Sequence, residues 1–212
     1  MKTDAFIDML VTDIGASLPN LRLRLLAAAT LGAALSIVLL VLFYGIRPHL
    51  AVAITTWHVA LKFVVGLALA ATGAVLALRL TRPEATGAGA WLILSPAPII
   101  LVAAGLVELM LVPPGQWLKQ AFGLHPIACL FSVPLMSALP LAGVLWALRE
   151  GAPAVPAQVG AAAGAVAAGI GSAIYALHCP DDSPLFLAIW YVLAAILVVT
   201  VGRAGGARLL RW

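Results

Sequence analysis

Six long apolar runs, separated by short polar breaks, most constrain what this chain can fold into. Each run holds about 18–23 residues, enough for a helix to cross a hydrocarbon core about 30 Å thick. Backbone groups in lipid must be bonded within a helix or a closed barrel, and these runs lack the alternation of barrel strands. The chain is therefore predicted to be an all-α polytopic membrane protein with six transmembrane helices. The runs cover Arg24–Tyr44, Trp57–Arg79, Trp91–Val112, Ile127–Leu148, Gln158–Leu177 and Leu185–Gly202.

Composition excludes the main alternatives to a membrane protein. Of the 212 residues, 64% are hydrophobic and 9% are charged, whereas a soluble domain is about one quarter charged. The apolar content excludes intrinsic disorder, and two cysteines are too few for a disulfide scaffold. The net charge of +4 combines 12 basic with 8 acidic residues. It therefore reflects few acids rather than many bases, and direct binding to nucleic acid is not expected.

The basic residues predict how the chain is oriented. With the N-terminus in the cytoplasm, nine Lys and Arg face inward and two face outward, so both termini are expected to be cytoplasmic. The chain then divides into a cytoplasmic tail (residues 1–20), a transmembrane bundle (21–203) and a cytoplasmic C-terminal tail (204–212). The inward set is Lys2, Arg22, Arg24, Arg79, Arg82, Arg149, Arg203, Arg208 and Arg211, and the outward set is Arg47 and Lys119.

Two charged residues, Lys62 and Glu108, fall inside predicted spans. Each lies about one turn from the outer end of its span, so the two share a depth. A charge in the membrane costs free energy unless it is paired, reaches the interface or meets water. An intramembrane ion pair between Lys62 and Glu108 is the favoured interpretation. The alternatives are snorkelling of Lys62, a proton or substrate site in a small-solute transporter or channel, and a ligand-sensing role.

Two cysteines are predicted to lie at the outer face, because Cys129 opens the fourth span and Cys179 closes the fifth. In an oxidising compartment such a pair can form a disulfide, whereas buried thiols are also ordinary core residues. His125, His178, Asp181 and Asp182 flank them. Thiolates and imidazoles bind soft metals and zinc. The spacing matches no compact zinc motif, so capping and loop-holding roles compete with a metal or redox sensor.

The fifth span is rich in glycine and alanine. Gly160 and Gly164 form a GxxxG pair. A second small-residue stripe consists of Ala161, Ala165, Gly169 and Ala173. Such faces let helix backbones approach closely. Packing inside the bundle is the favoured interpretation, with a homodimer as the alternative.

The N-terminal tail has the pattern of a short amphipathic helix that Pro19 would end. It lacks the Lys/Arg-rich polar face of a membrane-surface helix, and an acidic helix with an apolar stripe suits a groove on a partner protein. A disordered leader, or a helix lying under the bundle, is the alternative. The residues that carry the pattern are Asp4, Phe6, Asp8, Met9, Leu10, Asp13 and Ile14.

Several segments resemble one known family. They are Met1-Lys2-Thr3-Asp4 with Phe6, Ile7 and Leu10; Arg149 with Gly151-Ala152-Pro153 and Pro156; His178-Cys179-Pro180-Asp181-Asp182-Ser183-Pro184; Trp190-Tyr191; and Leu209-Leu210-Arg211-Trp212. Over nearly its whole length the chain is similar to the NrsF family. Its members are small bacterial inner-membrane proteins with six predicted spans, and they act as anti-sigma factors on extracytoplasmic-function (ECF) sigma factors.

The resemblance implies a function and a set of site residues. The N-terminal segment would hold the sigma factor through Asp4, Phe6, Ile7 and Leu10, with Asp8 and Asp13 nearby. Phe6 stands where the family usually has leucine. The family's two cysteines match Cys129 and Cys179, which implies a sensing role.

The resulting hypothesis is a multi-pass inner-membrane anti-sigma factor with no catalytic activity and no cofactor, whose periplasmic signal is a metal ion or a redox change. Its expected partners are an ECF sigma factor and membrane lipid. A transporter that uses Lys62 and Glu108 is the main alternative. A membrane thiol oxidoreductase is disfavoured because the sequence contains no CxxC motif.

Overall fold

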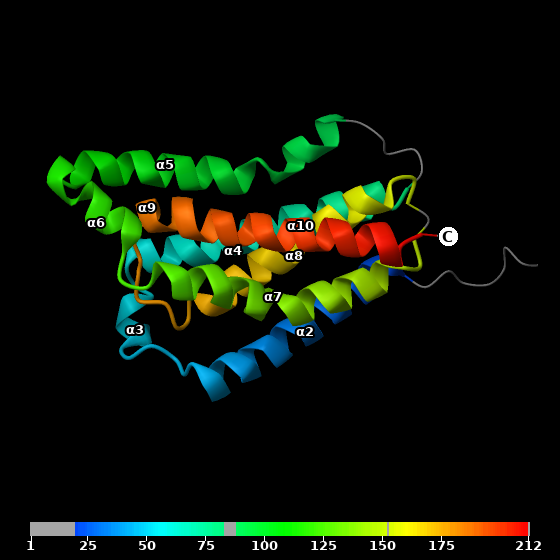
Figure 1. Ribbon diagram of the computed structural model, residues 1–212, viewed down its shortest axis with the longest axis horizontal. Coiled ribbons are helices and arrows are strands. Elements are labelled where there is room, and N and C mark those ends of the chain that lie inside the picture. Colours follow the sequence, from blue (N-terminus) through cyan, green and yellow to red (C-terminus); the bar gives the residue numbers. More distant parts are fainter. Residues whose placement is uncertain (1–19, 83–87, 152, 212) are drawn as a thin grey trace, which may run out of the picture.

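The computed structural model describes residues 20–82, 88–151 and 153–211. These residues form an elongated bundle of roughly parallel and antiparallel helices (Figure 1). Its long helices are α2 (Leu21–Phe43), α4 (Trp57–Leu80), α5 (Pro96–Leu111), α7 (Pro126–Leu148), α8 (Pro156–Tyr175) and α10 (Val192–Leu209). The shorter elements are α3 (Leu50–Ala53), η1 (Ala88–Leu94), η2 (Pro114–Gln116), α6 (Trp117–Phe122), α9 (Pro184–Phe186) and η3 (Leu187–Tyr191).

Proline sets where four of these helices begin. Pro96, Pro126, Pro156 and Pro184 each occupy the first turn of a helix. The missing N–H costs nothing there, because the first N–H groups of a helix have no partner within it. Ser183 adds a side-chain cap, since its hydroxyl accepts a hydrogen bond from the Leu185 N–H.

Five helices of the described chain are long and apolar enough to cross a membrane, and up to six are if one bent pair counts as a span. That pair is Pro96–Leu111 with Pro114–Phe122, bent by 120°. The prediction of an unbroken third span over Trp91–Val112 is also wrong, because the helix is interrupted before Pro96. A 3-10 segment ends at Leu94 and α5 begins at Pro96. Pro96 and Pro98 lack the N–H groups that would have continued the helix back toward Trp91.

The last apolar helical segment extends beyond the predicted span Leu185–Gly202. The helical segment Pro184–Leu209 has 26 residues, so residues 204–209 of the predicted C-terminal tail continue α10. A π-helical turn, Leu187–Tyr191, interrupts this segment near its start. Isolated π turns inside helices are often found at functional sites.

Helix α8 forms the centre of the bundle. It packs against α10, α4, α7 and α2, and 83% of its apolar window is buried inside the protein. Its small residues are what allow this. A Cβ on Gly202 would lie 2.5 Å from the Gly160 carbonyl oxygen, and one on Gly66 would lie 2.9 Å from that of Gly169. The small-residue stripe is used within the chain, as predicted, so it is not free to form a homodimer.

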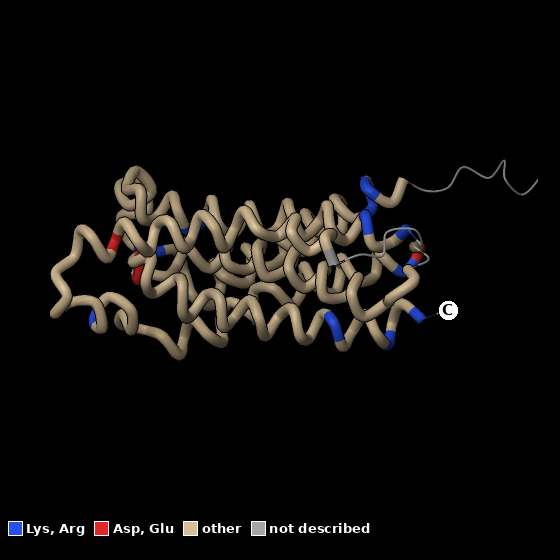
Figure 2. The backbone as a smooth tube through the Cα atoms, turned by 90° about the horizontal axis from the view of Figure 1, so that it is seen from above, with Lys and Arg blue, Asp and Glu red and all other residues tan. Residues whose placement is uncertain are grey.

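The charged residues divide between the two ends of the bundle (Figure 2). Most Lys and Arg lie at the end where α2 begins and α10 ends, which we call the basic end. Arg24 forms an ion pair with Glu150 there and joins the start of α2 to the end of α7. The opposite end carries Glu108, Asp181 and Asp182 together with a few bases.

The packing of α8 predicts different outcomes for one substitution at two glycines. In Gly169→Ala the new methyl group would overlap the backbone of Gly66 and Ala70, and overpacking of this kind costs about 1–3 kcal/mol. In Gly105→Ala the methyl group meets nothing within 4 Å, so alanine's higher helix propensity should leave stability unchanged or raise it. Thermal unfolding of both purified variants in detergent tests this. Equal melting temperatures would contradict the close packing of α4 on α8.

Candidate functional site

The loop that joins α8 to α9, residues 176–183, is held by two cations from other parts of the chain. We call this loop the cysteine loop, because it contains Cys179. Arg47, from the segment between α2 and α3, binds Asp182 through two nitrogens, with an Nη1–Oδ1 distance of 2.8 Å and an Nη2–Oδ2 distance of 3.0 Å. Lys62 of α4 donates to Asp182 Oδ1 at 2.7 Å. Both cations also donate to the Cys179 carbonyl oxygen at 3.1 Å.

This charge cluster of Arg47, Lys62 and Asp182 is sheltered from solvent. The Lys62 side chain has no exposed surface, and those of Arg47 and Asp182 are 15% and 23% exposed. Burial raises the pKa of Asp182, but hydrogen bonds from Arg47 and Lys62 outweigh it and leave that pKa below its usual value. The hydrogen bond to Asp182 raises the pKa of Arg47. The Asp182 carboxyl and the Arg47 guanidinium are therefore charged near neutral pH, and Arg47 and Lys62 both bind the same carboxylate.

The predicted Lys62–Glu108 ion pair is not formed. Glu108 is buried on α5, where Oε2 lies 3.3 Å from His58 Nε2 and Oε1 lies 3.5 Å from Ser183 Oγ. Lys62 and Glu108 are predicted to lie at a similar depth. However, depth does not say which acid faces which base, and Asp182 of the cysteine loop takes Lys62 instead.

The two cysteines lie together beneath the cysteine loop. Cys129, in the first turn of α7, and Cys179 are both free and buried. A hydrogen bond with the Cys129 thiol lowers the pKa of Cys179; burial opposes this shift and the nearby Lys62 ammonium supports it. The Cys179 Sγ also lies 3.8 Å from the Asp181 carbonyl oxygen. The arrangement therefore provides two adjacent thiols, one of which is electrostatically favoured as a thiolate.

His178 and Asp181 have structural partners. Asp181 accepts hydrogen bonds from the backbone N–H groups of Leu124 and His125, at 2.8 and 3.0 Å. It therefore fixes the turn that leads into α7. A Cβ at Gly123, whose φ is +61°, would collide with Asp181, so this turn requires glycine. His178 Nδ1 donates to the Gly45 carbonyl oxygen at 3.0 Å.

The predicted metal-binding set is not assembled. Within residues 20–82, 88–151 and 153–211, no three His, Cys, Asp or Glu side chains are arranged to hold a metal ion. Asp182 is bound to Arg47 and Lys62, and Asp181 to backbone amides. The alternative of loop-holding residues therefore describes Asp181, Asp182 and His178 better than metal ligation does.

Sequence reasoning missed several members of this site. The sequence alone indicates Arg47 only as one of two outward bases, and it gives no sign of His58 or Ser183. One signal was available, because Arg47, Lys62 and Asp182 all fall near the same predicted end of the bundle, where so few charges occur that opposite signs should meet. The predicted partner-binding residues Asp4, Phe6, Ile7, Asp8, Leu10 and Asp13 lie outside the described residues.

Comparison with known proteins assigns the chain to a family. The sequence profile of the NrsF family, described as "Negative regulator of sigma F", matches residues 10–212. The chain is 32% identical over 214 residues to the anti-sigma-F factor NrsF of Caulobacter vibrioides, and 31% identical over 220 residues to the probable anti-sigma-F factor NrsF of Azospira oryzae. Each comparison covers 100% of both chains. No solved structure matches significantly.

The charge cluster predicts strong coupling between Lys62 and Asp182. Asp182→Asn leaves a buried ammonium without its carboxylate, which is expected to cost about 3 kcal/mol of unfolding free energy. In a Lys62→Met background the same substitution should cost much less, because the buried charge is gone. Glu150→Gln is a control at an exposed pair and should cost under about 1 kcal/mol. Unfolding in mixed detergent micelles measures all four variants, and purely additive costs at Lys62 and Asp182 would refute the coupling.

Proposed function

The chain belongs to the NrsF family of negative regulators of sigma F, and we propose that it holds an ECF sigma factor at the cytoplasmic face of a bacterial inner membrane. The observation that carries this proposal is the similarity to two anti-sigma factors, which covers the full length of this chain and of each relative. The role of this family is regulatory rather than enzymatic. Its members act by binding a sigma factor, which then cannot direct transcription.

The distribution of charge supports a cytoplasmic position for both termini. The start of α2 and the end of α10 share the basic end (Figure 2). Lys and Arg are enriched in loops that remain in the cytoplasm. The charge cluster and the cysteine loop then face the periplasm, at the opposite end of the bundle.

The N-terminal tail is the proposed binding element for the sigma factor. Phe6, Ile7 and Leu10 would supply apolar anchors, and Asp4, Asp8 and Asp13 would add negative charge. An amphipathic helix of this kind binds by placing its apolar face in a groove of the partner. It is tethered directly to α2, so its partner would be held against the basic end.

The cysteine loop is the proposed sensor. Cys129 and Cys179 are adjacent and Cys179 is favoured as a thiolate, so a periplasmic oxidant could convert the two thiols to a disulfide, with loss of two protons and two electrons to that oxidant. A soft metal ion bound by the thiolate is the other signal we consider. Either change acts on the loop that Arg47 and Lys62 hold.

A change in the cysteine loop has a direct route to the basic end. The loop follows α8 without a break, and α8 packs along most of its length on α10 and α4 through backbone contacts at glycines. Closely packed helices shift as units rather than absorb a displacement locally. We propose that a signal at the cysteine loop moves α8 and thereby weakens the hold of the tail on the sigma factor.

The transport hypothesis has less support. It required Lys62 and Glu108 to form a polar site within the bundle, but Lys62 is fully buried in the charge cluster and Glu108 is bound to His58 and Ser183. The cavity beside Lys62 is lined almost wholly by apolar residues, which does not suit a polar solute.

Affinity purification from gently solubilised membranes tests the role of the tail. The wild type should recover a sigma factor, and Phe6→Asp with Leu10→Asp should lose it because two charges enter the apolar stripe. Ala5→Asp with Thr12→Asp is a matched control that adds the same charge away from the stripe and should retain binding. Recovery of the sigma factor by every variant would exclude this tail as the binding element. Recovery by none, with the sigma factor expressed, would overturn the anti-sigma proposal.

A sigma-dependent reporter tests the role of the cysteines. Cys129→Ala with Cys179→Ala keeps both positions apolar, so the bundle should remain folded and repression should persist without stress. Induction by an oxidant or by a soft metal ion should then be lost. Each single variant should also lose induction by the oxidant, because a disulfide needs both sulfurs. Unchanged induction in the double variant under every stress that induces the wild type would refute the sensor.

A further inference from the structure

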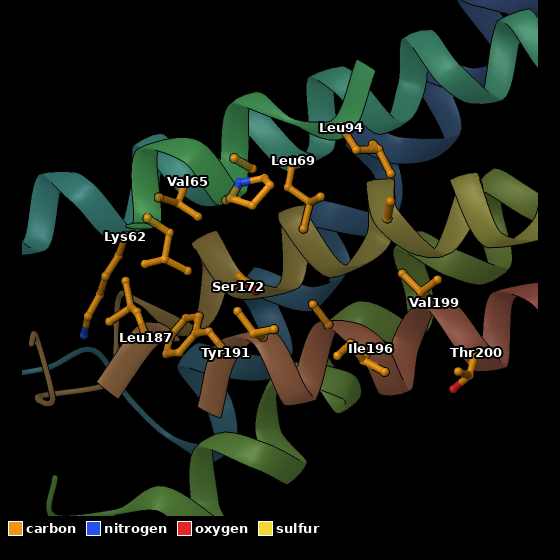
Figure 3. A pocket seen from close by; sticks show the side chains of 17 residues that line it. Lys62, Val65, Leu69, Leu94, Ser172, Leu187, Tyr191, Ile196, Val199 and Thr200 are labelled. Carbon is orange, nitrogen blue, oxygen red and sulfur yellow. The ribbon is translucent and has the colours of Figure 1, made fainter. Parts of the chain in front are cut away.

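A cavity of about 280 Å³ lies between α5 and the rest of the bundle. Its walls come from α4, the start of α5, α8 and the segment from η3 into α10 (Figure 3). Apolar side chains dominate the lining, including Val65, Leu69, Leu94, Leu187, Ile196 and Val199. The proposed function does not use this cavity.

Small residues leave the space open. Ala97 of α5, Ala165 of α8 and Ala195 of α10 line the cavity from three sides. Helix α5 makes fewer close approaches to the bundle than α8 does, and at its far end Glu108 is held by His58 and Ser183. The helix is therefore anchored at one end while part of its length spans an unfilled volume.

The chemistry of the lining selects an apolar ligand. Lys62 is the one charged residue among those that line the cavity, and in Figure 3 its nitrogen points away from it. That nitrogen is bound to Asp182 and to the Cys179 carbonyl oxygen. The Thr200 hydroxyl donates to the Leu197 carbonyl oxygen. No charge in the lining is free to bind an ion. Burial of apolar surface is therefore the main source of affinity, and the Tyr191 hydroxyl, which has no hydrogen-bond partner among the described residues, is one polar group at the lining.

The length and position of the cavity match one lipid tail. On the last helical segment its lining runs from Leu187 to Thr200, a rise of about 20 Å at 1.5 Å per residue. Half of a hydrocarbon core is about 15 Å thick, so a chain that fills one leaflet fits along this wall. Val192 and Ile196 line the cavity and are also 39% and 52% exposed. The cavity therefore opens at the apolar surface of the bundle, where lipid lies.

We propose that this cavity binds an acyl chain of a membrane phospholipid. The N-terminal tail is a poor occupant, because Asp4, Asp8 and Asp13 would carry three carboxylates toward an apolar lining. A phospholipid tail is already at the right depth and brings no charge with it. It fills the volume between α5 and α10 that the side chains leave empty.

The bound chain would contact residues that also serve the cysteine loop. Lys62 and Tyr191 line the cavity. Lys62 holds Asp182, and the Tyr191 side chain is buried in the same apolar cluster as Cys129 and Cys179. Occupancy of the cavity therefore stiffens the wall on which the cysteine loop rests. This link concerns lipid binding and stands whether or not the tail binds a sigma factor.

Photolabelling of the full-length protein tests the proposal. The protein is reconstituted in vesicles of phosphatidylethanolamine and phosphatidylglycerol with a trace of phosphatidylethanolamine that carries a diazirine in its acyl chain, and labelled peptides are identified by mass spectrometry. Labels are expected on Leu69, Leu101 and Val199, which face the cavity. Val65→Phe should fill the cavity and reduce labelling at these residues roughly tenfold. Val64→Phe is the matched control, because Val64 is 50% exposed and does not line the cavity, and it should label like the wild type.

A second pair of variants guards against misfolding. Ala195→Phe should reduce labelling in the same way, and Leu197→Phe, on the exposed face of the same helix, should not. Each variant must elute as the wild type does on size exclusion. Equal labelling of the cavity residues in all variants, or labels confined to exposed residues such as Leu42 and Phe43, would overturn the proposal. Co-purification of an isoprenoid compound that blocks the labelling would also overturn it, because the occupant would not be an acyl chain.

Discussion

Close backbone packing around α8 is the constraint on which the rest of the structure depends. Helices gain little hydrophobic free energy from one another inside lipid, so association relies on van der Waals contact and on small residues at the contacts. Glycines of α8 meet glycines of α4 and α10 at distances that leave no room for a side chain. This fixes the central helix, and through it the position of the cysteine loop that follows it.

The charge cluster is the second organising interaction. It can form because α8 ends at Tyr175, so that the cysteine loop brings Asp182 to Arg47 and Lys62. Asp182 lies between Arg47 and Lys62, which come from segments more than a hundred residues away. A buried ion pair of this kind adds little net stability but penalises any other arrangement, because a broken pair leaves a charge in an apolar setting. It therefore holds the cysteine loop in one position over Cys129, which gives the two thiols a defined geometry.

The parts of this molecule differ in how far they could be predicted. The spans, the basic end and the internal use of the α8 stripe follow from hydropathy, charge and residue size, which are local properties. The helix break before Pro96 could have been predicted from the two prolines, but the apolar residues on either side favoured a single continuous span. The partner of Lys62 and the actual contacts of the predicted metal ligands could not be predicted from the sequence, because residues at one depth can meet in many combinations. The role of the N-terminal tail in binding a sigma factor remains a prediction from the sequence and from its resemblance to the NrsF family.

These residues by themselves determine a chain of helices that are apolar enough to span a membrane. Backbone groups in lipid must be bonded within a helix or a closed barrel, and the apolar runs lack the alternation of barrel strands. The inferred orientation likewise needs only the count of basic residues in each connection. Rotation of each helix about its axis was open until the bundle assembled. That rotation placed Asp182, rather than Glu108, beside Lys62, brought Cys129 to Cys179, and left a cavity under α5. The reason is physical: periodicity defines which residues share a face, but only packing of glycine against backbone decides which face meets which.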